Sequence, residues 1–88
     1  MTPPQCRAAR VLLGWTVQTL ANVADVSTTT VVNFENGNRR AQSSTIRILR
    51  AAFETAGIEF LGEATTDDAE VEAIQLTDGS TVRLRRRG

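Results

Sequence analysis

The sequence predicts a mainly α-helical fold, in which four short helices are followed by a small β-hairpin or sheet. Up to residue 57, apolar residues recur three and four positions apart, so that each segment presents one apolar face of helical period. Side chains that cap helices begin these segments, and glycines end most of them. Beyond residue 57, apolar and polar residues alternate as they do in strands. We therefore expect a helical domain over residues 1–57 and a β element over residues 58–88.

The first and fourth helices have recognisable ends. The segment Thr2–Gln5 has the form of a capping box with proline at the first helical position, and Gly14 is expected to end this helix. The fourth helix is expected to begin near Ser43 or Ser44 and to end at Gly57. The apolar sides are predicted to hold Cys6, Ala9, Leu12 and Leu13 in the first helix and Ile46, Leu49, Phe53 and Ala56 in the fourth.

Two shorter helices are predicted between residues 16 and 37. Thr16 and Ser27 stand where hydroxyl groups would cap the two helices, and Gly37 stands where a left-handed residue would close the second. The link between the helices is too short for a free loop and needs a residue with positive φ, which Asp25 tolerates better than most residues. The apolar stripes are Leu20, Ala21 and Ala24 in one helix and Val31 and Phe34 in the other.

The end of the chain is predicted to form strands. A short strand is expected at residues 58–61, an acidic linker at 62–70, and a hairpin around Asp78 and Gly79. A two-stranded hairpin alone is marginally stable in water, so it needs another surface. That surface is the strand at 58–61, the fourth helix or a second subunit, of which the last is favoured and would make the hairpin a dimerisation element. The face to be covered holds Ile74, Leu76, Val82 and Leu84.

The composition narrows the classes of function. The chain has 88 residues and a net charge of zero, but residues 1–57 carry six arginines against three acidic residues, while residues 58–88 carry four against seven. It has no histidine and one cysteine, Cys6, which we expect to serve in packing. These residues cannot build a zinc site or a recognisable hydrolytic centre, so we expect no cofactor, no metal and no enzyme activity. Without an 18-residue apolar run or a secretory leader, a cytoplasmic, nucleoid-associated protein is expected.

One stretch carries a family resemblance. The run LLGWTVQTLANVADVSTTTVVNFENGNRR has an aromatic residue after LG, an LA pair, VS before the third helix and FENG at its close. In these motifs the chain resembles the Cro and phage-repressor class (XRE-like) of bacterial helix-turn-helix regulators, over roughly residues 4–56. Two residues depart from that pattern, because Val17 replaces a glutamine that contacts phosphate and Asp25 replaces a glycine in the turn. The neighbouring Gln18 could make the phosphate contact that Val17 cannot make.

The resemblance implies a DNA interface on the second and third helices. A helix in the major groove reads bases with its first turns, and threonine and asparagine can contact thymine methyl groups and adenine respectively. The base-reading candidates are Thr28, Thr29, Thr30, Val32 and Asn33. The phosphate-contacting candidates are Thr16, Gln18, Asn36, Arg39 and Arg40. The alternatives are that the threonines only cap a helix and that the two arginines are solvated. The resemblance also implies a structural ion pair between Arg10 and Glu35.

The expected function is therefore sequence-specific DNA binding by a transcriptional regulator, most simply a repressor. Its partners would be double-stranded DNA and a second copy of the chain, on an inverted repeat with half-sites about 34–36 Å apart. The alternative is a protein-interaction module, such as an antitoxin-like or anti-repressor partner, which would use the acidic C-terminal segment to bind a protein. No membrane partner is expected.

Overall fold

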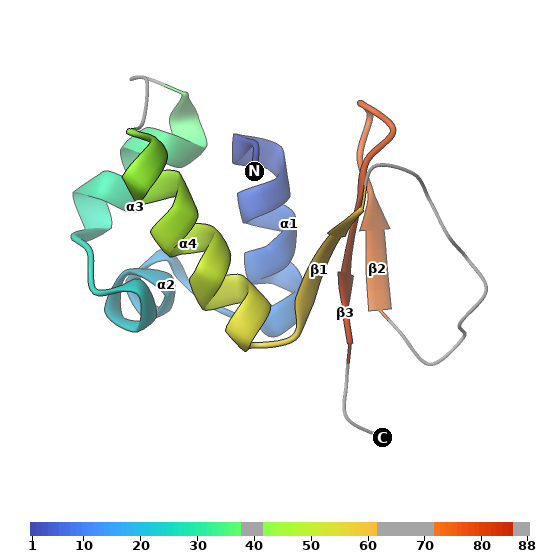
Figure 1. The fold of residues 1–88 in the computed structure, drawn as a ribbon, viewed down its shortest axis with the longest axis horizontal. Coiled ribbons are helices and arrows are strands. Elements are labelled where there is room, and N and C mark those ends of the chain that lie inside the picture. The colour runs from blue at the N-terminus through green and yellow to red at the C-terminus, as the bar shows by residue number, and fades with distance from the viewer. Residues whose placement is uncertain (38–41, 62–71, 86–88) are drawn as a thin grey trace.

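In the part of the chain that the structure describes, four helices are followed by an antiparallel sheet of three strands. We describe residues 1–37, 42–61 and 72–85 of a computed structural model (Figure 1). The helices are α1 (Pro3–Leu13), α2 (Val17–Ala24), α3 (Thr28–Asn36) and α4 (Ser43–Thr55), and the strands are β1 (Ile58–Leu61), β2 (Glu72–Gln75) and β3 (Thr81–Leu84). The predicted fold class is confirmed. None of these helices is both long enough and apolar enough to cross a lipid bilayer.

The predicted caps begin the first three helices. The Thr2 hydroxyl accepts a hydrogen bond from the Gln5 amide at 3.3 Å, and the Gln5 side chain accepts one from the Thr2 amide at 2.8 Å. Thr16 and Ser27 each accept a bond of 3.1 Å from the backbone amide three residues later. Each contact satisfies an amide that the first turn leaves without a helical partner. The starts of these helices are therefore encoded locally.

Left-handed residues end the same three helices. Gly14 and Gly37 have φ angles of 69° and 67°, and Asp25 closes α2 with a φ of 58°. Among the described residues Asp25 is the only non-glycine with positive φ, as the short link between the helices requires. α4 differs, because it ends at Thr55, two residues before the predicted Gly57.

Gly57 instead joins α4 to the sheet. Its φ angle is 104°, and a Cβ atom added there would lie 2.8 Å from the carbonyl oxygen of Arg85. The Arg85 amide donates a hydrogen bond of 2.8 Å to the Gly57 carbonyl. Glycine is therefore required here by the close approach of two backbones, and not by the end of a helix.

The sheet has β3 at its centre, with β1 and β2 on either side. Antiparallel pairing sets Ile58 opposite Leu84 and Ile74 opposite Val82, which places their side chains on one face. This face packs against α1, and β1 also contacts α4. The predicted partner strand at 58–61 is thus present, but α1 was not among the predicted surfaces. α1 is buried on a broader side than expected, since Ala8 is only 6% exposed.

The hairpin between β2 and β3 turns at the predicted residues. The Gly79 amide donates to the Leu76 carbonyl, and the Leu76 amide donates to the Ser80 carbonyl. Gly79 has a φ angle of 89°, as expected for the left-handed residue of a three-residue hairpin loop. Asp78 accepts bonds from the Ser80 hydroxyl and amide, which lower the pKa of its carboxyl group.

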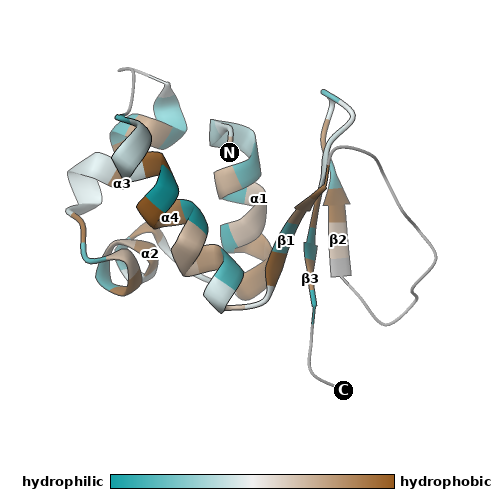
Figure 2. Ribbon diagram, in the orientation of Figure 1, coloured by the Kyte–Doolittle hydropathy of each residue, from teal (hydrophilic) through white to brown (hydrophobic). Residues whose placement is uncertain are grey.

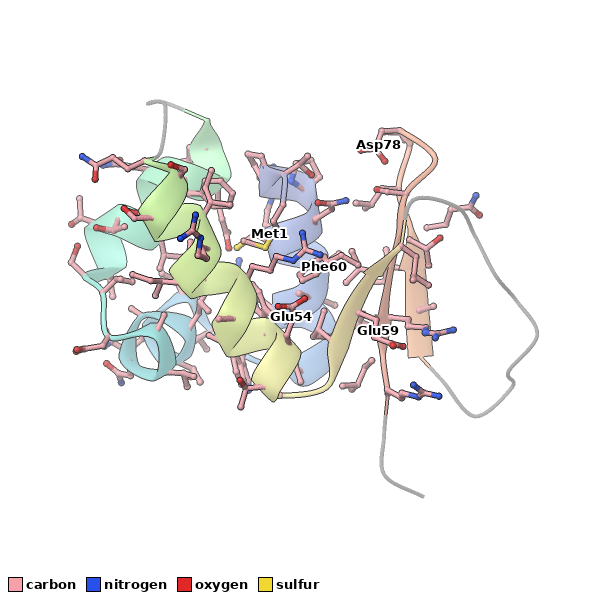
Figure 3. All side chains as sticks on the ribbon, in the orientation of Figure 1. Met1, Glu54, Glu59, Phe60 and Asp78 are labelled. Carbon is pink, nitrogen blue, oxygen red and sulfur yellow. The ribbon has the colours of Figure 1, made fainter. Side chains whose placement is uncertain are left out.

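Helices and sheet share one hydrophobic core. Hydrophobic and hydrophilic bands alternate along α4, as its amphipathic pattern predicts (Figure 2). Phe53 of α4 stacks on Trp15 at 5.8 Å and meets Phe60 of β1 edge to face at 6.2 Å between ring centroids. Phe60 points toward the helices, whereas Glu59 lies on the other side of β1 (Figure 3). The fully buried side chains of this core include Cys6, Leu20, Val31, Leu49, Phe53, Ile58 and Val82.

Candidate nucleic-acid interface

The α2 and α3 helices form a compact unit around a short turn. α2 is seen nearly end-on in the view of Figure 1, while α3 lies across the view. The Val26 amide donates to the Ala21 carbonyl at 3.0 Å, which closes α2 after the left-handed Asp25. Leu20 of α2 and Val31 of α3 are completely buried between the helices and the core. The turn and these contacts hold one helix against the other.

An ion pair holds α3 to α1 from the inner side. Nε and Nη2 of Arg10 donate to the two carboxylate oxygens of Glu35 at 2.6 and 2.8 Å, in the bidentate geometry typical of arginine. Nη1 of Arg10 also donates to the Trp15 carbonyl at 3.2 Å. Glu35 is only 6% exposed, and its hydrogen bond to Arg10 raises the pKa of that guanidinium. The pair therefore links α1 to α3, and Arg10 also holds Trp15 in the segment that precedes α2.

Cys6 completes this contact. Its Sγ donates to Oε2 of Glu35 at 3.2 Å. The Glu35 carboxylate is therefore bonded to two residues of α1, Arg10 and Cys6. Burial, and then the hydrogen bond to Glu35, raise the pKa of the Cys6 thiol well above its ordinary value. The thiol is therefore protonated and acts as a donor at neutral pH.

The side of α3 opposite this contact is polar and accessible. The buried side of the helix holds Val31, Phe34 and Glu35. The side facing away from them holds Thr29, Val32, Asn33 and Asn36. Thr29 and Asn36 are exposed, Val32 is 41% exposed, and Asn33 is half-buried. Three of the five base-reading candidates, Thr29, Val32 and Asn33, thus lie together on one accessible face.

The other two base-reading candidates lie at the margins of that face. Thr28 is half-buried and precedes Val32 by one helical turn. Thr30 is half-buried, and its hydroxyl lies 2.8 Å from the Ser27 hydroxyl that caps the helix. The Thr30 hydroxyl is therefore partly committed to the helix start.

The phosphate-contacting candidates at the start of α2 are exposed and already hydrogen-bonded. Thr16 caps α2, and its hydroxyl lies 3.0 Å from the hydroxyl of Thr19. Nε2 of Gln18 donates to Oδ1 of Asn22 at 3.0 Å across one helical turn. A primary amide has two N–H groups, so this contact orients Gln18 and leaves a second donor.

The remaining phosphate-contacting candidates follow the end of α3. Asn36 is the last residue of that helix and is exposed. Arg39 and Arg40 lie outside the described residues. Within the described part of the chain, the accessible end of α3 therefore offers an amide rather than a charge.

Two supporting contacts were missing from the prediction. The Gln18–Asn22 bond could have been anticipated, because residues four apart on a helix are neighbours. The Cys6–Glu35 bond joins residues that are 29 positions apart, and no local sequence pattern predicts it. Both contacts orient side chains in or behind the candidate interface.

Comparison with known protein families identifies the helix-turn-helix. A family model described as helix-turn-helix matches residues 7–60, which is more than half of the chain. The match begins within α1, includes α2 to α4, and reaches into β1. A search of curated proteins found no match. The chain therefore belongs to the helix-turn-helix family of the Cro and phage-repressor class, a family of DNA-binding regulatory domains and not of enzymes.

Proposed function

We propose that this protein is a sequence-specific DNA-binding transcriptional regulator, acting as a repressor, which places α3 in the major groove. The observation that carries the proposal is the polar, accessible face of α3, held from behind by the Arg10–Glu35 pair. A rigid support matters because side chains that contact bases must be held accurately in place if they are to distinguish one base pair from another. The proposed base-reading residues are Thr28, Thr29, Thr30, Val32 and Asn33.

Backbone contacts would come from the two ends of this unit. We propose that Thr16 and Gln18, at the start of α2, lie beside one phosphate, where helix amides also favour an anion. Asn36, Arg39 and Arg40 would contact the backbone beyond the other end of α3. Such contacts position the protein on the duplex but do not choose its sequence. They would make the affinity depend strongly on salt.

A homodimer on an inverted repeat completes the proposal. One small domain contacts few base pairs, and two domains on adjoining half-sites would multiply the specificity. The apolar face of the hairpin packs against α1 of the same chain, so it is not available to a second copy. A dimer through the C-terminal segment would therefore use strand edges or the outer face of the sheet. Inside the cell, such a protein would reside with the chromosomal DNA.

The alternative function is that of a protein-interaction module, such as an antitoxin-like or anti-repressor partner. The observation that favours it is the acidic balance of residues 58–88, which carry seven acidic residues against four arginines. Such a segment would be repelled by phosphates and would suit a basic protein surface. Both functions use the same fold.

Selection from random duplexes, followed by sequencing, tests the proposal. The selection is run at two salt concentrations, because nonspecific phosphate binding weakens steeply with salt while base preference persists. We expect a palindromic motif to be enriched at both. Binding that lacks enrichment and disappears at the higher salt would contradict the proposal and favour the interaction module.

A further inference from the structure

Building on the proposed function, we infer that α3 reads A·T base pairs, with Val32 as a specificity-determining residue that contacts the 5-methyl group of thymine. The inference rests on the chemistry that α3 presents to a groove and on the chemistry that it lacks.

α3 lacks side chains for reading G·C pairs through charge. No arginine or lysine occurs between Thr28 and Asn36, so the helix has no bidentate donor for O6 and N7 of guanine. A carboxylate can accept from the N4 amino group of cytosine. The one carboxylate of α3, Glu35, is 6% exposed and bonded to Arg10 and Cys6 on the inner side. It is therefore withheld from the groove.

The accessible face offers methyl groups instead. Val32 exposes 41% of its surface on the side of α3 that faces away from the core. Thr28 lies one turn before it and carries a further methyl group. The thymine 5-methyl is the apolar group that base pairs present in the major groove. An isopropyl side chain on this face matches that group and offers nothing to the polar edges of guanine or cytosine.

Asn33 supplies the complementary polar contact. It directly follows Val32, and among the described residues no hydrogen bond occupies its side chain. An asparagine amide forms a bidentate contact with N6 and N7 of adenine. Adjacent residues of α3 thus present chemistry for the two bases of A·T pairs.

The chain contains a matched control for an exposed valine. Val11 on α1 is 69% exposed and lies outside the proposed interface. Isolated exposed apolar residues are common on protein surfaces, so exposure alone carries no function. Any effect of removing the Val32 methyl groups must therefore exceed that of the same change at Val11.

Substitution of deoxyuridine for thymine in the selected operator tests the inference. Uracil lacks only the 5-methyl group, so the change isolates that contact. We expect the unaltered protein to bind about fourfold more weakly for each contacted thymine replaced, the factor that follows from about 0.8 kcal/mol per buried methylene-sized group. Val32→Ala should lose the difference at the thymine that Val32 contacts, and Val11→Ala should keep the full difference. Thermal unfolding of each variant confirms that it is folded.

Three results would overturn the inference and leave DNA binding in place. These are a selected motif made of G·C pairs, equal binding of thymine and uracil duplexes by the unaltered protein, and full methyl discrimination by Val32→Ala. Selection without any enriched motif would instead remove the proposed function, and the inference with it. The two failures are thus distinguishable in the same experiment.

Discussion

The inner and outer faces of α3 differ in how they treat polar groups. On the inner face, Glu35 is buried and its carboxylate is bonded to Arg10 and Cys6. On the outer face, Asn33 has no side-chain hydrogen bond to the described residues, and Asn36 is exposed. The polar group of the inner face thus stabilises the fold, while the polar groups of the outer face remain available to bind a partner. Substitutions on the two faces should therefore separate stability from DNA affinity.

The largest effect is expected from Glu35→Ala. Removing the carboxylate strands the Arg10 guanidinium, whose side chain is 17% exposed, behind α3. Loss of one partner of a buried ion pair costs about 3–5 kcal/mol. Urea unfolding should show this decrease in the free energy of unfolding.

The exposed pair Arg50–Glu54 on α4 is the control for that change. Its side chains are 45% and 51% exposed, so Glu54→Ala should cost about 1 kcal/mol or less. Equal losses in the two variants would mean that the inner contact of α3 has no special role in stability.

The next largest difference in the free energy of unfolding is expected between variants of two adjacent valines. Val31 is completely buried and Val32 is 41% exposed, although they are neighbours in the sequence. Val31→Ala should lower the free energy of unfolding by about 1–3 kcal/mol, because it removes buried methyl groups. Val32→Ala should change it by less than about 0.5 kcal/mol. Similar losses by denaturant titration would show that the assigned faces of α3 are wrong.

The double variant Thr29→Ala with Asn33→Ala tests the outer face for function. We expect its affinity for the selected operator to fall about tenfold or more, since a good bidentate base contact is worth about 1–3 kcal/mol. Its unfolding midpoint should stay close to that of the unaltered protein, because neither residue belongs to the buried core. Fluorescence anisotropy and thermal unfolding measure the two quantities. Undiminished operator affinity would remove both residues from the proposed interface.

A smaller loss of stability than that of Val31→Ala is expected at the start of α3. Ser27→Ala removes the side-chain cap on the Thr30 amide and should cost about 1 kcal/mol. Ser43→Ala is the control, because α4 begins without a side-chain capping bond. Calorimetry should show a lower melting temperature for the first variant only. A matching decrease for the second would assign the loss to helix propensity and not to capping.

The features that were predictable from the sequence are those encoded by local chemistry. Thr2, Thr16 and Ser27 cap helices by reaching an amide three residues ahead, and Asp25 turns the chain within a few residues. The covering of the sheet by α1 was not predictable in this way. It joins distant segments, and Ala8 carries no stronger signal than any other alanine in a helix.

The candidate interface likewise has features that local sequence predicts and features that depend on distant contacts. Helical period alone separates the accessible Val32 from the buried Val31. The Arg10–Glu35 contact joins residues 25 apart, and it was anticipated only through the family resemblance. Its extension to Cys6 depends on how α1 and α3 pack, which no spacing in the sequence specifies.

The buried thiol of Cys6 allows the local opening of the fold to be followed by chemical labelling. It is the only cysteine, it is inaccessible in the folded state, and its raised pKa keeps it from forming the reactive thiolate. An alkylating reagent should therefore modify it only when α1 separates from α3. The labelling rate then reports how often the support behind the proposed reading helix is lost, and whether bound DNA suppresses that event.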